Sequence, residues 1–341
     1  MKAIIPVAGV GTRMKPHTHT APKVLLRVAG KPMLGHILDE LVKVGTEEVT
    51  LIVGYYGQKV IDYIKKEYKF KKVNYVWQEE RRGLGHAIWM TKKHHKTDEP
   101  VLIVLGDTVF EADFKKLFKF KNNVLGVKEV EDPRRFGIAQ LDDSGTLITH
   151  LVEKPQEFVG NLALVGIYHI TQPKLMFKCL DHIIKKDIKT RGEYQITDAL
   201  QEMIKRGADF VPFRIEGWYD CGKPETLLET NRKLLDLFKA HPTAAQMKKF
   251  EDAVIIPPVS IHPTAKIHRS IVGPHVDVAE NAEIRHSVIS DSIVSADALL
   301  SNMVASGSIL GNGARACGVT HQLNVGDNSE INLAWGAGHR A

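Results

Sequence analysis

The chain has 341 residues, of which 43% are hydrophobic and 25% are charged, as in a globular protein of about two domains. No stretch approaches the roughly 20 apolar residues that span a bilayer, and the opening apolar run is too short for a signal peptide. We therefore expect a cytoplasmic protein without a membrane partner. The net charge of +6 permits nucleic-acid binding, but the basic residues are scattered, so we expect small anionic ligands and no nucleic acid.

The first two thirds of the chain alternate short apolar runs with longer amphipathic stretches. The expected strands cover residues 3–8, 48–53, 73–77 and 101–105, and the expected helices cover residues 33–44, 58–68 and 85–93. Within the first helix, the apolar residues recur at helical spacing. The alternation predicts an α/β domain with a Rossmann-like, mostly parallel sheet and helices on both faces. Ligands of such sheets bind beyond the carboxyl ends of the strands.

The pattern changes after residue 253, where aliphatic residues recur at about every sixth position. The series comprises Ile261, Ile267, Val272, Val278, Ile284 and Ile289, and then, more loosely, Val294, Leu299, Val304 and Ile309. A helix cannot use this period, so we predict a smaller parallel β-helix domain, with irregular antiparallel strands as the alternative. The expected boundaries are 1–235 for the first domain, 236–252 for a linker, 253–332 for the β-helix and 333–341 for a frayed tail.

A glycine-rich turn, residues 8–13, follows the first expected strand. Glycines let backbone N–H groups approach phosphate oxygens, and Arg13 and Lys23 add fixed positive charge beside the turn. The spacing fits neither the P-loop nor the dinucleotide-binding fingerprint. We therefore expect a phosphate-binding loop of another kind. A structural turn followed by a solvated lysine is the alternative.

Asp107 follows the apolar run of residues 101–105, at the carboxyl end of an expected strand. A carboxylate at that point suits Mg²⁺, which prefers oxygen ligands and often takes only one or two from the protein. The sequence therefore predicts a Mg²⁺ ligand here. A capping or salt-bridged aspartate is the alternative.

These motifs resemble those of the sugar nucleotidyltransferase family, also called nucleoside-diphosphate-sugar pyrophosphorylases, and most closely its glucose-1-phosphate thymidylyl- and uridylyltransferases. The resemblance covers residues 1 to about 231, and the repeat after residue 253 resembles the left-handed β-helix of longer members. It implies transfer of a nucleotidyl group from UTP or dTTP to a sugar-1-phosphate, with release of pyrophosphate and Mg²⁺ as the cofactor. Glucose-1-phosphate is the expected acceptor, and N-acetylglucosamine-1-phosphate is next. Thr108 stands where thymidylyltransferases often have Asn, which leaves the sugar open.

The resemblance also implies a role for each matching residue. The nucleotide-binding residues would be Ala8, Gly9, Gly11, Thr12, Arg13, Gln78 and Gly83, with the Gln78 amide pairing with the pyrimidine edge. The catalytic residues would be Arg13, Lys23, Asp107 and Asp220, of which the two aspartates would hold the metal. The sugar-phosphate-binding residues would be Gly137, Glu153, Lys154, Tyr168, Arg191 and Trp218. Packing is the alternative for Tyr168, Arg191 and Trp218, and a surface ion pair is the alternative for Glu153 and Lys154.

Two other functions remain open from the sequence. Some relatives with β-helix tails are bifunctional and carry an acetyl-CoA-dependent acyltransferase there, for which histidine is a plausible base. The candidate histidines are His262, His268, His275, His286 and His321. The second alternative is a non-catalytic scaffold subunit. Such a subunit should have lost some charged residues of the site, whereas Arg13, Lys23, Asp107, Lys154 and Asp220 are all present here. We expect the β-helix to serve in subunit contacts of a homo-oligomer.

The remaining reactive side chains are expected to take no part in the chemistry. The three cysteines, Cys179, Cys221 and Cys317, are too few and too widely spaced for a disulfide framework or a cysteine zinc site. A sugar phosphate is already an anion and needs no general base. We therefore expect no catalytic histidine, and we expect His17, His19, His94 and His95 to lie on the polar surface.

Overall fold

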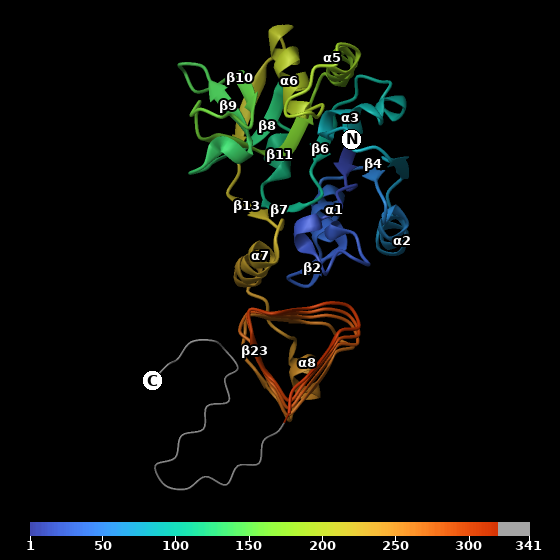
Figure 1. Cartoon of the computed structure of the whole chain (residues 1–341), viewed down its shortest axis with the longest axis vertical. Coiled ribbons are helices and arrows are strands. Elements are labelled where there is room, and N and C mark those ends of the chain that lie inside the picture. The colour runs from blue at the N-terminus through green and yellow to red at the C-terminus, as the bar shows by residue number, and fades with distance from the viewer. Residues whose placement is uncertain (320–341) are drawn as a thin grey trace.

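The computed structural model describes residues 1–319, which form two domains (Figure 1). An α/β domain lies above a triangular stack of strands, and helix α7 (Pro224–Leu237) leads from one to the other. The predicted linker, 236–252, contains helix α8 (Ala244–Lys249). Across the described range, no helix has both the length and the apolar content to cross a bilayer. The predicted tail, 333–341, lies outside the described residues, as does the end of the predicted β-helix.

The α/β domain is built on a nine-stranded sheet. Its order is β10-β9-β11-β6-β1-β4-β5, and β8 pairs with both β11 and β12. The strands are β1 (Lys2–Pro6), β4 (Glu48–Val53), β5 (Lys72–Trp77), β6 (Val101–Val104), β8 (Asn123–Glu129), β9 (Gly137–Leu141), β10 (Ile148–Glu153), β11 (Leu162–Ile170) and β12 (Phe210–Arg214). Strands β6, β1, β4 and β5 are parallel, whereas β11 runs antiparallel to its neighbours. The predicted α/β class with a mostly parallel central sheet is confirmed.

Helices cover both faces of this sheet because each has one apolar side. Leu34, Ile37, Leu38 and Leu41 of α1 are all buried in the same core as the apolar side of α2. Helices α3, α5 and α6 line the core on the other face. The helices are α1 (Met33–Lys43), α2 (Gly57–Glu67), α3 (Leu84–Trp89), α4 (Phe114–Leu117), α5 (Pro173–Lys185) and α6 (Ile196–Lys205).

Two pairs of short strands lie outside the main sheet and point toward the second domain. Strand β7 (Thr108–Glu111) pairs antiparallel with β13 (Gly217–Asp220), and β13 is followed by α7. The hairpin of β2 (Arg27–Val28) and β3 (Lys31–Pro32) precedes α1. In Figure 1 the β2 hairpin lies near the β-helix, and α7 lies between the β7–β13 pair and the β-helix.

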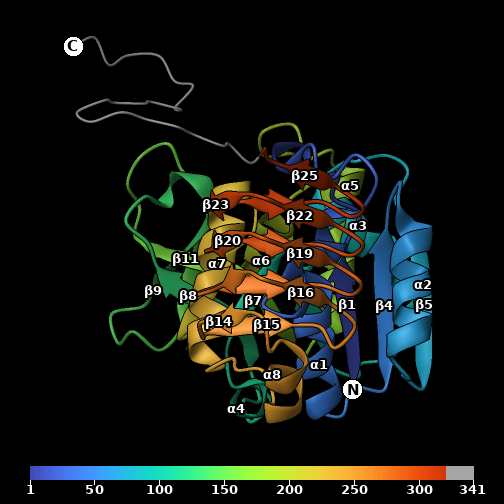
Figure 2. The same ribbon diagram turned by 90° about the horizontal axis from the view of Figure 1, so that it is seen from below.

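The second domain is a left-handed parallel β-helix with three faces, each a four-stranded parallel sheet, and Figure 2 shows its coils stacked on one another. The first face is β14 (Val254–Ile255), β17 (Ile271–Val272), β20 (Val288–Ser290) and β23 (Val304–Ser306). The second is β15 (Val259–Ile261), β18 (Val276–Val278), β21 (Ile293–Val294) and β24 (Ile309–Leu310). The third is β16 (Lys266–His268), β19 (Glu283–Arg285), β22 (Leu299–Ser301) and β25 (Arg315–Cys317). The predicted repeat is confirmed, and its first aliphatic residues, 261 to 294 in the series, fill the coil interior.

The predicted series is wrong for its last three members. Val304 is 82% exposed, and Leu299 and Ile309 are only partly buried. The inward positions are taken by Leu300, Ala305 and Leu310. The registers give the reason, because Ile284 pairs with Leu300 and Ile289 pairs with Ala305, so each of these inward positions lies one residue beyond the predicted one.

His95 is also placed differently from the prediction, because it is buried rather than on the polar surface. It is 3% exposed and follows the 3₁₀ helix Lys92–His94, which turns its ring toward Phe177 of α5, with 6.0 Å between ring centroids. Neither ring nitrogen has a hydrogen-bond partner among residues 1–319. Burial lowers the pKa of His95 to about 4, so the ring is neutral at physiological pH.

Candidate active site

The glycine-rich turn after β1 lies directly against the chain segment that carries Lys23. Gly11 has a left-handed φ of 68°, and a Cβ added there would lie 2.9 Å from the Cβ of Lys23. The Thr18 hydroxyl donates a hydrogen bond to the Gly11 carbonyl at 2.8 Å, which closes the turn. Only glycine meets both the conformation and the close approach at this position.

This turn forms one wall of a cavity of about 390 Å³ at the carboxyl ends of the parallel strands. All of the predicted nucleotide-binding residues line it, together with two of the other predicted catalytic residues. The predicted residues in the lining are Ala8, Gly9, Gly11, Thr12, Arg13, Lys23, Gln78, Gly83 and Asp107. The location agrees with the strand-end rule for ligands of parallel sheets.

Lys23 and Asp107 form an ion pair at the edge of this cavity, with 2.9 Å between Nζ and Oδ2. Lys23 is 6% exposed, whereas the Asp107 side chain is half-exposed. A buried cation needs a charged partner, and the exposed side of Asp107 remains open to a ligand. The ammonium group therefore lies where it can also meet a phosphate oxygen.

Asp220 reaches the same place from another strand, because β13 pairs with β7. In that register Asp220 lies opposite Thr108, the neighbour of Asp107. A Cβ added to Gly222 would lie 2.9 Å from Asp220 Oδ1 and 3.0 Å from an Arg13 guanidinium nitrogen, so Asp220 and Arg13 flank Gly222. The structure thus brings together all four residues predicted to be catalytic.

The two aspartates fit a magnesium ion. They stem from adjacent positions of a strand pair, and Mg²⁺ usually takes one or two carboxylates together with substrate phosphates. Residues 1–319 contain no group of three or more His, Cys, Asp or Glu side chains that would enclose a metal by themselves. Oxygens of the substrate phosphates would therefore supply further ligands of a metal ion held by these two aspartates.

Cys221 lies beside these charged groups but is not a nucleophile. It is fully buried, and burial raises the pKa of its thiol to about 12, with the carboxylates of Asp220 and Asp107 adding to the rise. Cys179 is likewise buried, and its pKa is raised to about 11, also chiefly by burial. Both thiols are therefore protonated at neutral pH.

The segment predicted to meet the base lies across the cavity from the glycine turn. Gly83 has a φ of 105°, and a Cβ there would lie 2.5 Å from the carbonyl oxygen of Tyr194. The Gly85 N–H donates to that same carbonyl at 2.8 Å. Gln78 follows the end of β5 and lines the cavity. Glycine is needed here because the backbone of residue 194 lies so close.

Two charged residues without a predicted role also line this cavity, Arg81 and Glu193. Arg81 belongs to an Arg81-Arg82 pair whose composition indicates a solvated surface. In the structure, Arg82 places its guanidinium 5.1 Å from the centre of the Tyr194 ring, and Arg81 borders the cavity. The only signal in the sequence was its position between Gln78 and Gly83.

The predicted sugar-phosphate residues form a second cluster, centred on Glu153. Glu153 pairs with Gly137 across β10 and β9, accepts a 2.7 Å hydrogen bond from Thr197 Oγ1 and lies 3.1 Å from Lys154 Nζ. The Glu153 side chain is 10% exposed and that of Lys154 is 36% exposed, so the ion pair is partly buried. Arg191 donates to the Lys154 carbonyl at 2.8 Å.

The two predicted aromatic sugar contacts differ from each other. Tyr168 is 4% exposed and belongs to the core, where burial, with a smaller effect of Glu153, raises its pKa; this favours the packing alternative. Trp218 packs edge-on against Phe136, with 4.9 Å between ring centroids. Its buried Nε1–H has no acceptor within residues 1–319, so a ligand hydroxyl there would satisfy it.

Asp198 is a further residue of this second cluster to which the sequence analysis gave no role. Burial raises its carboxyl pKa, to which nearby Glu153 adds. One of its oxygens is buried and lacks a partner in the described part of the chain. Buried orphan acceptors are uncommon, so this oxygen also lies where a donor from a ligand is expected.

The histidines of the β-helix do not share a site. His275 contacts Asp236 at 3.0 Å and Asp291 at 3.2 Å, and His262 Nδ1 lies 2.9 Å from the Thr264 hydroxyl. His268 lies 3.6 Å from Asp252, and His286 follows a different strand. His321 lies outside the described residues.

The residues of both clusters lie within a stretch that known proteins share. A family model described as nucleotidyl transferase matches residues 2–236. The chain belongs to the nucleotidyl transferase family. It is 34% identical to the UTP–glucose-1-phosphate uridylyltransferase AglF of Haloferax volcanii, over 69% of this chain and 96% of that protein. It is 30% identical to a glucose-1-phosphate thymidylyltransferase of Streptomyces antibioticus, over 98% and 99% of the two chains.

The fold of this nucleotidyltransferase is similar to that of a UDP-glucose pyrophosphorylase solved with UDP-glucose. The TM-score is 0.60 at 26% identity, and the match covers 69% of this chain and 98% of the other. The predicted resemblance to the sugar nucleotidyltransferases is therefore confirmed, as is the predicted enzyme class. The roles of individual site residues stay predictions.

Proposed function

We propose that this nucleotidyltransferase joins a sugar-1-phosphate to UTP or dTTP and releases pyrophosphate. Glucose-1-phosphate is the acceptor named for the relatives AglF and the thymidylyltransferase, and it is the first candidate here. The observation that carries the proposal is the convergence of Arg13, Lys23, Asp107 and Asp220 beside the glycine turn. Two cations and two carboxylates at or beside a cavity of about 390 Å³ suit the chemistry of a triphosphate and a metal.

The proposed reaction is a single in-line displacement. An oxygen of the sugar phosphate attacks the α-phosphorus, a new P–O bond forms, and pyrophosphate leaves with the electrons of the bond that breaks. Arg13 and Lys23 stabilise the negative charge of the triphosphate, and the glycine turn orients it. Asp107 and Asp220 would hold Mg²⁺, which supplies further neutralisation of phosphate charge. Because the nucleophile is already an anion, no general base is required.

The proposed base and sugar contacts divide between the two clusters. Gln78 would read the pyrimidine edge, and the Gly83 backbone would approach the base. Glu153 and Lys154 would meet the sugar hydroxyls and its phosphate, with Trp218 beside them. The printed names of the relatives include both uridylyl- and thymidylyltransferases, so both nucleotides belong to the proposal. Such substrates are consistent with a cytoplasmic enzyme.

Pyrophosphate release tests this proposal. The purified full chain is assayed with Mg²⁺ across UTP, dTTP, ATP, CTP and GTP, each paired with glucose-1-phosphate or N-acetylglucosamine-1-phosphate. We expect release only with a pyrimidine triphosphate, and only when the sugar phosphate and the metal are both present. Pyrophosphate release only with a purine triphosphate, or no release with any pair of substrates, would contradict the proposal.

The proposal includes a homo-oligomer, and the faces of the β-helix indicate where subunits would meet. Val254, Ile271, Val288 and Val304 are all exposed, and each pairs with the next along the first face. The third face instead carries charged residues such as Lys266 and Arg285. An aligned row of exposed aliphatic side chains is typical of a contact surface, and a second copy of the chain can present the same row.

Light scattering tests the oligomer. We expect wild-type protein to have the mass of a multimer, and Val288→Glu to lower that mass to one chain. Lys266→Glu, on the charged face, is the matched control and should leave the mass unchanged. A wild-type monomer, or a multimer that survives Val288→Glu, would show that this face is not the contact.

A further inference from the structure

One side of the triangular β-helix is turned toward the catalytic domain (Figure 1). It is the second face, because Asp277 on β18 bonds to Arg27, and Ile293 on β21 is its most informative residue. Alternate residues of a strand point to opposite sides, and the neighbouring Val294 fills the coil interior. Ile293 therefore points out of the coil. It is nevertheless 1% exposed, so the catalytic domain must supply its burial.

Ile293 belongs to one contiguous apolar cluster with residues of the catalytic domain. Three members of that cluster flank predicted catalytic residues: Met14 follows Arg13, Cys221 follows Asp220, and Val109 closely follows Asp107. The same cluster contains Leu227, Leu234 and Leu235 from the buried side of α7. The catalytic side chains thus project from backbone that is anchored in a core which the β-helix completes.

A buried ion pair fixes how the two domains dock. Arg27 Nε lies 3.1 Å from both carboxylate oxygens of Asp277, and the Gly30 N–H donates to Asp277 at 2.9 Å. Asp277 is fully buried. If the catalytic domain moved away while Asp277 stayed buried, its carboxylate would be left as an uncompensated charge. Arg27 follows the 3₁₀ helix Lys23–Leu25, so the pair also anchors the chain just beyond Lys23.

A buried amide adds a second fixed link. Asn231 of α7 is 1% exposed. Its Oδ1 accepts from the Ala29 N–H at 2.9 Å, and its Nδ2 donates to the His275 carbonyl at 3.1 Å. One side chain therefore ties the β2–β3 hairpin to the β-helix, with geometry that tolerates little displacement.

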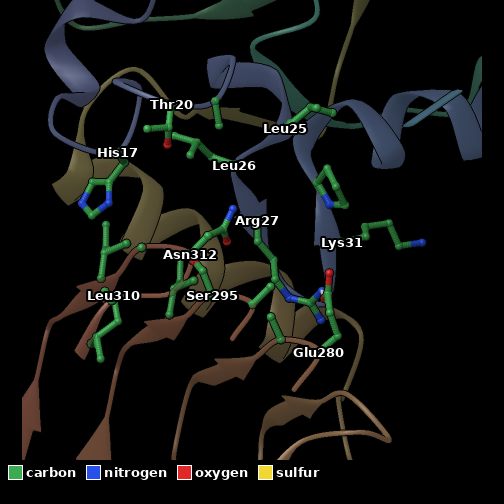
Figure 3. Close-up of a pocket in the computed structure, with 18 of the residues that line it drawn as sticks. His17, Thr20, Leu25, Leu26, Arg27, Lys31, Glu280, Ser295, Leu310 and Asn312 are labelled. Carbon is green, nitrogen blue, oxygen red and sulfur yellow. Dashed lines mark ion pairs between the residues drawn. The ribbon is translucent and has the colours of Figure 1, made fainter. Parts of the chain in front are cut away.

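These contacts are concentrated rather than spread over the interface. A cavity of about 810 Å³ lies between the domains, and Figure 3 shows His17 of the catalytic domain facing Leu310 and Asn312 of the β-helix across it, with Arg27 and Glu280 to one side. Open space separates part of the two surfaces, so Ile293 supplies apolar contact at a place where the domains do meet, beside the polar links of Asp277 and Asn231.

We propose that Ile293 is a positioning residue, through which the β-helix holds Arg13, Asp107 and Asp220 in their working arrangement. The inference rests on the proposed nucleotidyl transfer. It gives the β-helix a role in turnover within each subunit, separate from any contact between subunits. Displacement of a catalytic group by about 1 Å reduces turnover by as much as about 10²-fold, so a small loss of support is measurable.

A matched pair of variants tests this inference. Ile293→Ala removes a buried side chain that faces the catalytic domain, and Ile289→Ala removes an equally buried one that faces the coil interior. Pyrophosphate release, thermal unfolding and nucleotide binding are measured for both, at a temperature well below either unfolding midpoint. We expect kcat of Ile293→Ala to fall about tenfold with little change in KM, whereas Ile289→Ala keeps wild-type kcat. Ile293→Val should restore most of the activity.

Equal kcat for the two folded alanine variants would overturn the inference. If either alanine variant does not fold, Ile293→Val and Ile289→Val are compared in the same way. A wild-type chain that releases no pyrophosphate would contradict the proposed function instead, so the two failures are distinguishable.

Discussion

The two domains differ in where they place their charged side chains. In the catalytic domain, a buried lysine and two aspartates meet beyond the main sheet, beside the β7–β13 strand pair. In the β-helix, the coil interior is aliphatic, and its fully buried carboxylate, Asp277, serves the contact with the other domain. The difference teaches that the repeat provides a stiff support, whereas chemistry is assembled where separate segments of the catalytic domain meet beyond its main sheet.

The sharpest test of this comparison removes the carboxylates at the strand ends. Asp107→Asn and Asp220→Asn should each reduce kcat by about 10³-fold, because neutral amides hold Mg²⁺ poorly and preorganised charge dominates such reactions. The measurement is Mg²⁺-dependent pyrophosphate release with the fold checked by circular dichroism. Asp143→Asn, at an exposed turn, is the control. Wild-type turnover in either site variant would remove that residue from the metal site.

Lys23 extends the test to the positive charge of the site. Lys23→Met keeps the apolar stem but removes the ammonium group, so we expect kcat to fall by about 10²-fold. The exposed Lys93 gives a matched control, Lys93→Met, with unchanged kcat. Steady-state kinetics measure kcat and KM separately. A rise in KM alone would show that Lys23 only binds the triphosphate and does not stabilise the transition state.

Gln78 tests whether the second wall of the cavity reads the base. Loss of one amide contact corresponds to about tenfold in affinity, so Gln78→Ala should raise KM for the pyrimidine triphosphate with little effect on kcat. Gln58→Ala, on the exposed side of α2, is the control. An unchanged KM and an unchanged preference over ATP would exclude Gln78 from base recognition.

Buried histidines give the catalytic domain a pH dependence that the β-helix core lacks. Burial lowers the pKa of His95 and of His169 to about 4, below the value of about 6.5 in an unfolded chain. The unfolded state therefore binds protons first. The associated stability is complete above about pH 6.5 and is lost as the pH falls toward 4. Urea unfolding at a series of pH values should show this loss, and His95→Leu should reduce its slope.

The smallest effect is expected in the β-helix interior. Ile284 is fully buried there, so Ile284→Val should cost about 1 kcal/mol of unfolding free energy while kcat stays at the wild-type value. Thermal unfolding and pyrophosphate release check the two parts. A clear loss of turnover without loss of folded protein would mean that the coil interior, and not only its outer face, affects the site.

Local features of this chain were predictable because short-range physics determines them. The glycine turn, the amphipathic α1 and the strand ending before Asp107 all follow from spacing and composition. The β-helix was equally readable, because one aliphatic residue recurs in each flat strand. The error at Val304 began just after Val294, because the next inward residue is Leu300 and not Leu299, and every later inward position is shifted with it.

Contacts between residues that are distant in the sequence could not be predicted from local sequence patterns. The position of Asp220 beside Asp107 depends on the pairing of β7 with β13, which are distant in sequence, and only the family resemblance indicated it. The burial of His95 depends on its contact with Phe177. The links from Arg27 to Asp277 and from Asn231 to His275 join the two domains. No short-range pattern in the sequence predicts such contacts.

The most direct test of the account is a crystal structure of the full chain with UTP and Mn²⁺ in place of Mg²⁺. The account predicts the triphosphate along residues 9–13, the base beside Gln78, and an anomalous manganese peak between the carboxylates of Asp107 and Asp220. A manganese peak away from both aspartates, or nucleotide bound instead in the cavity between the domains, would contradict it.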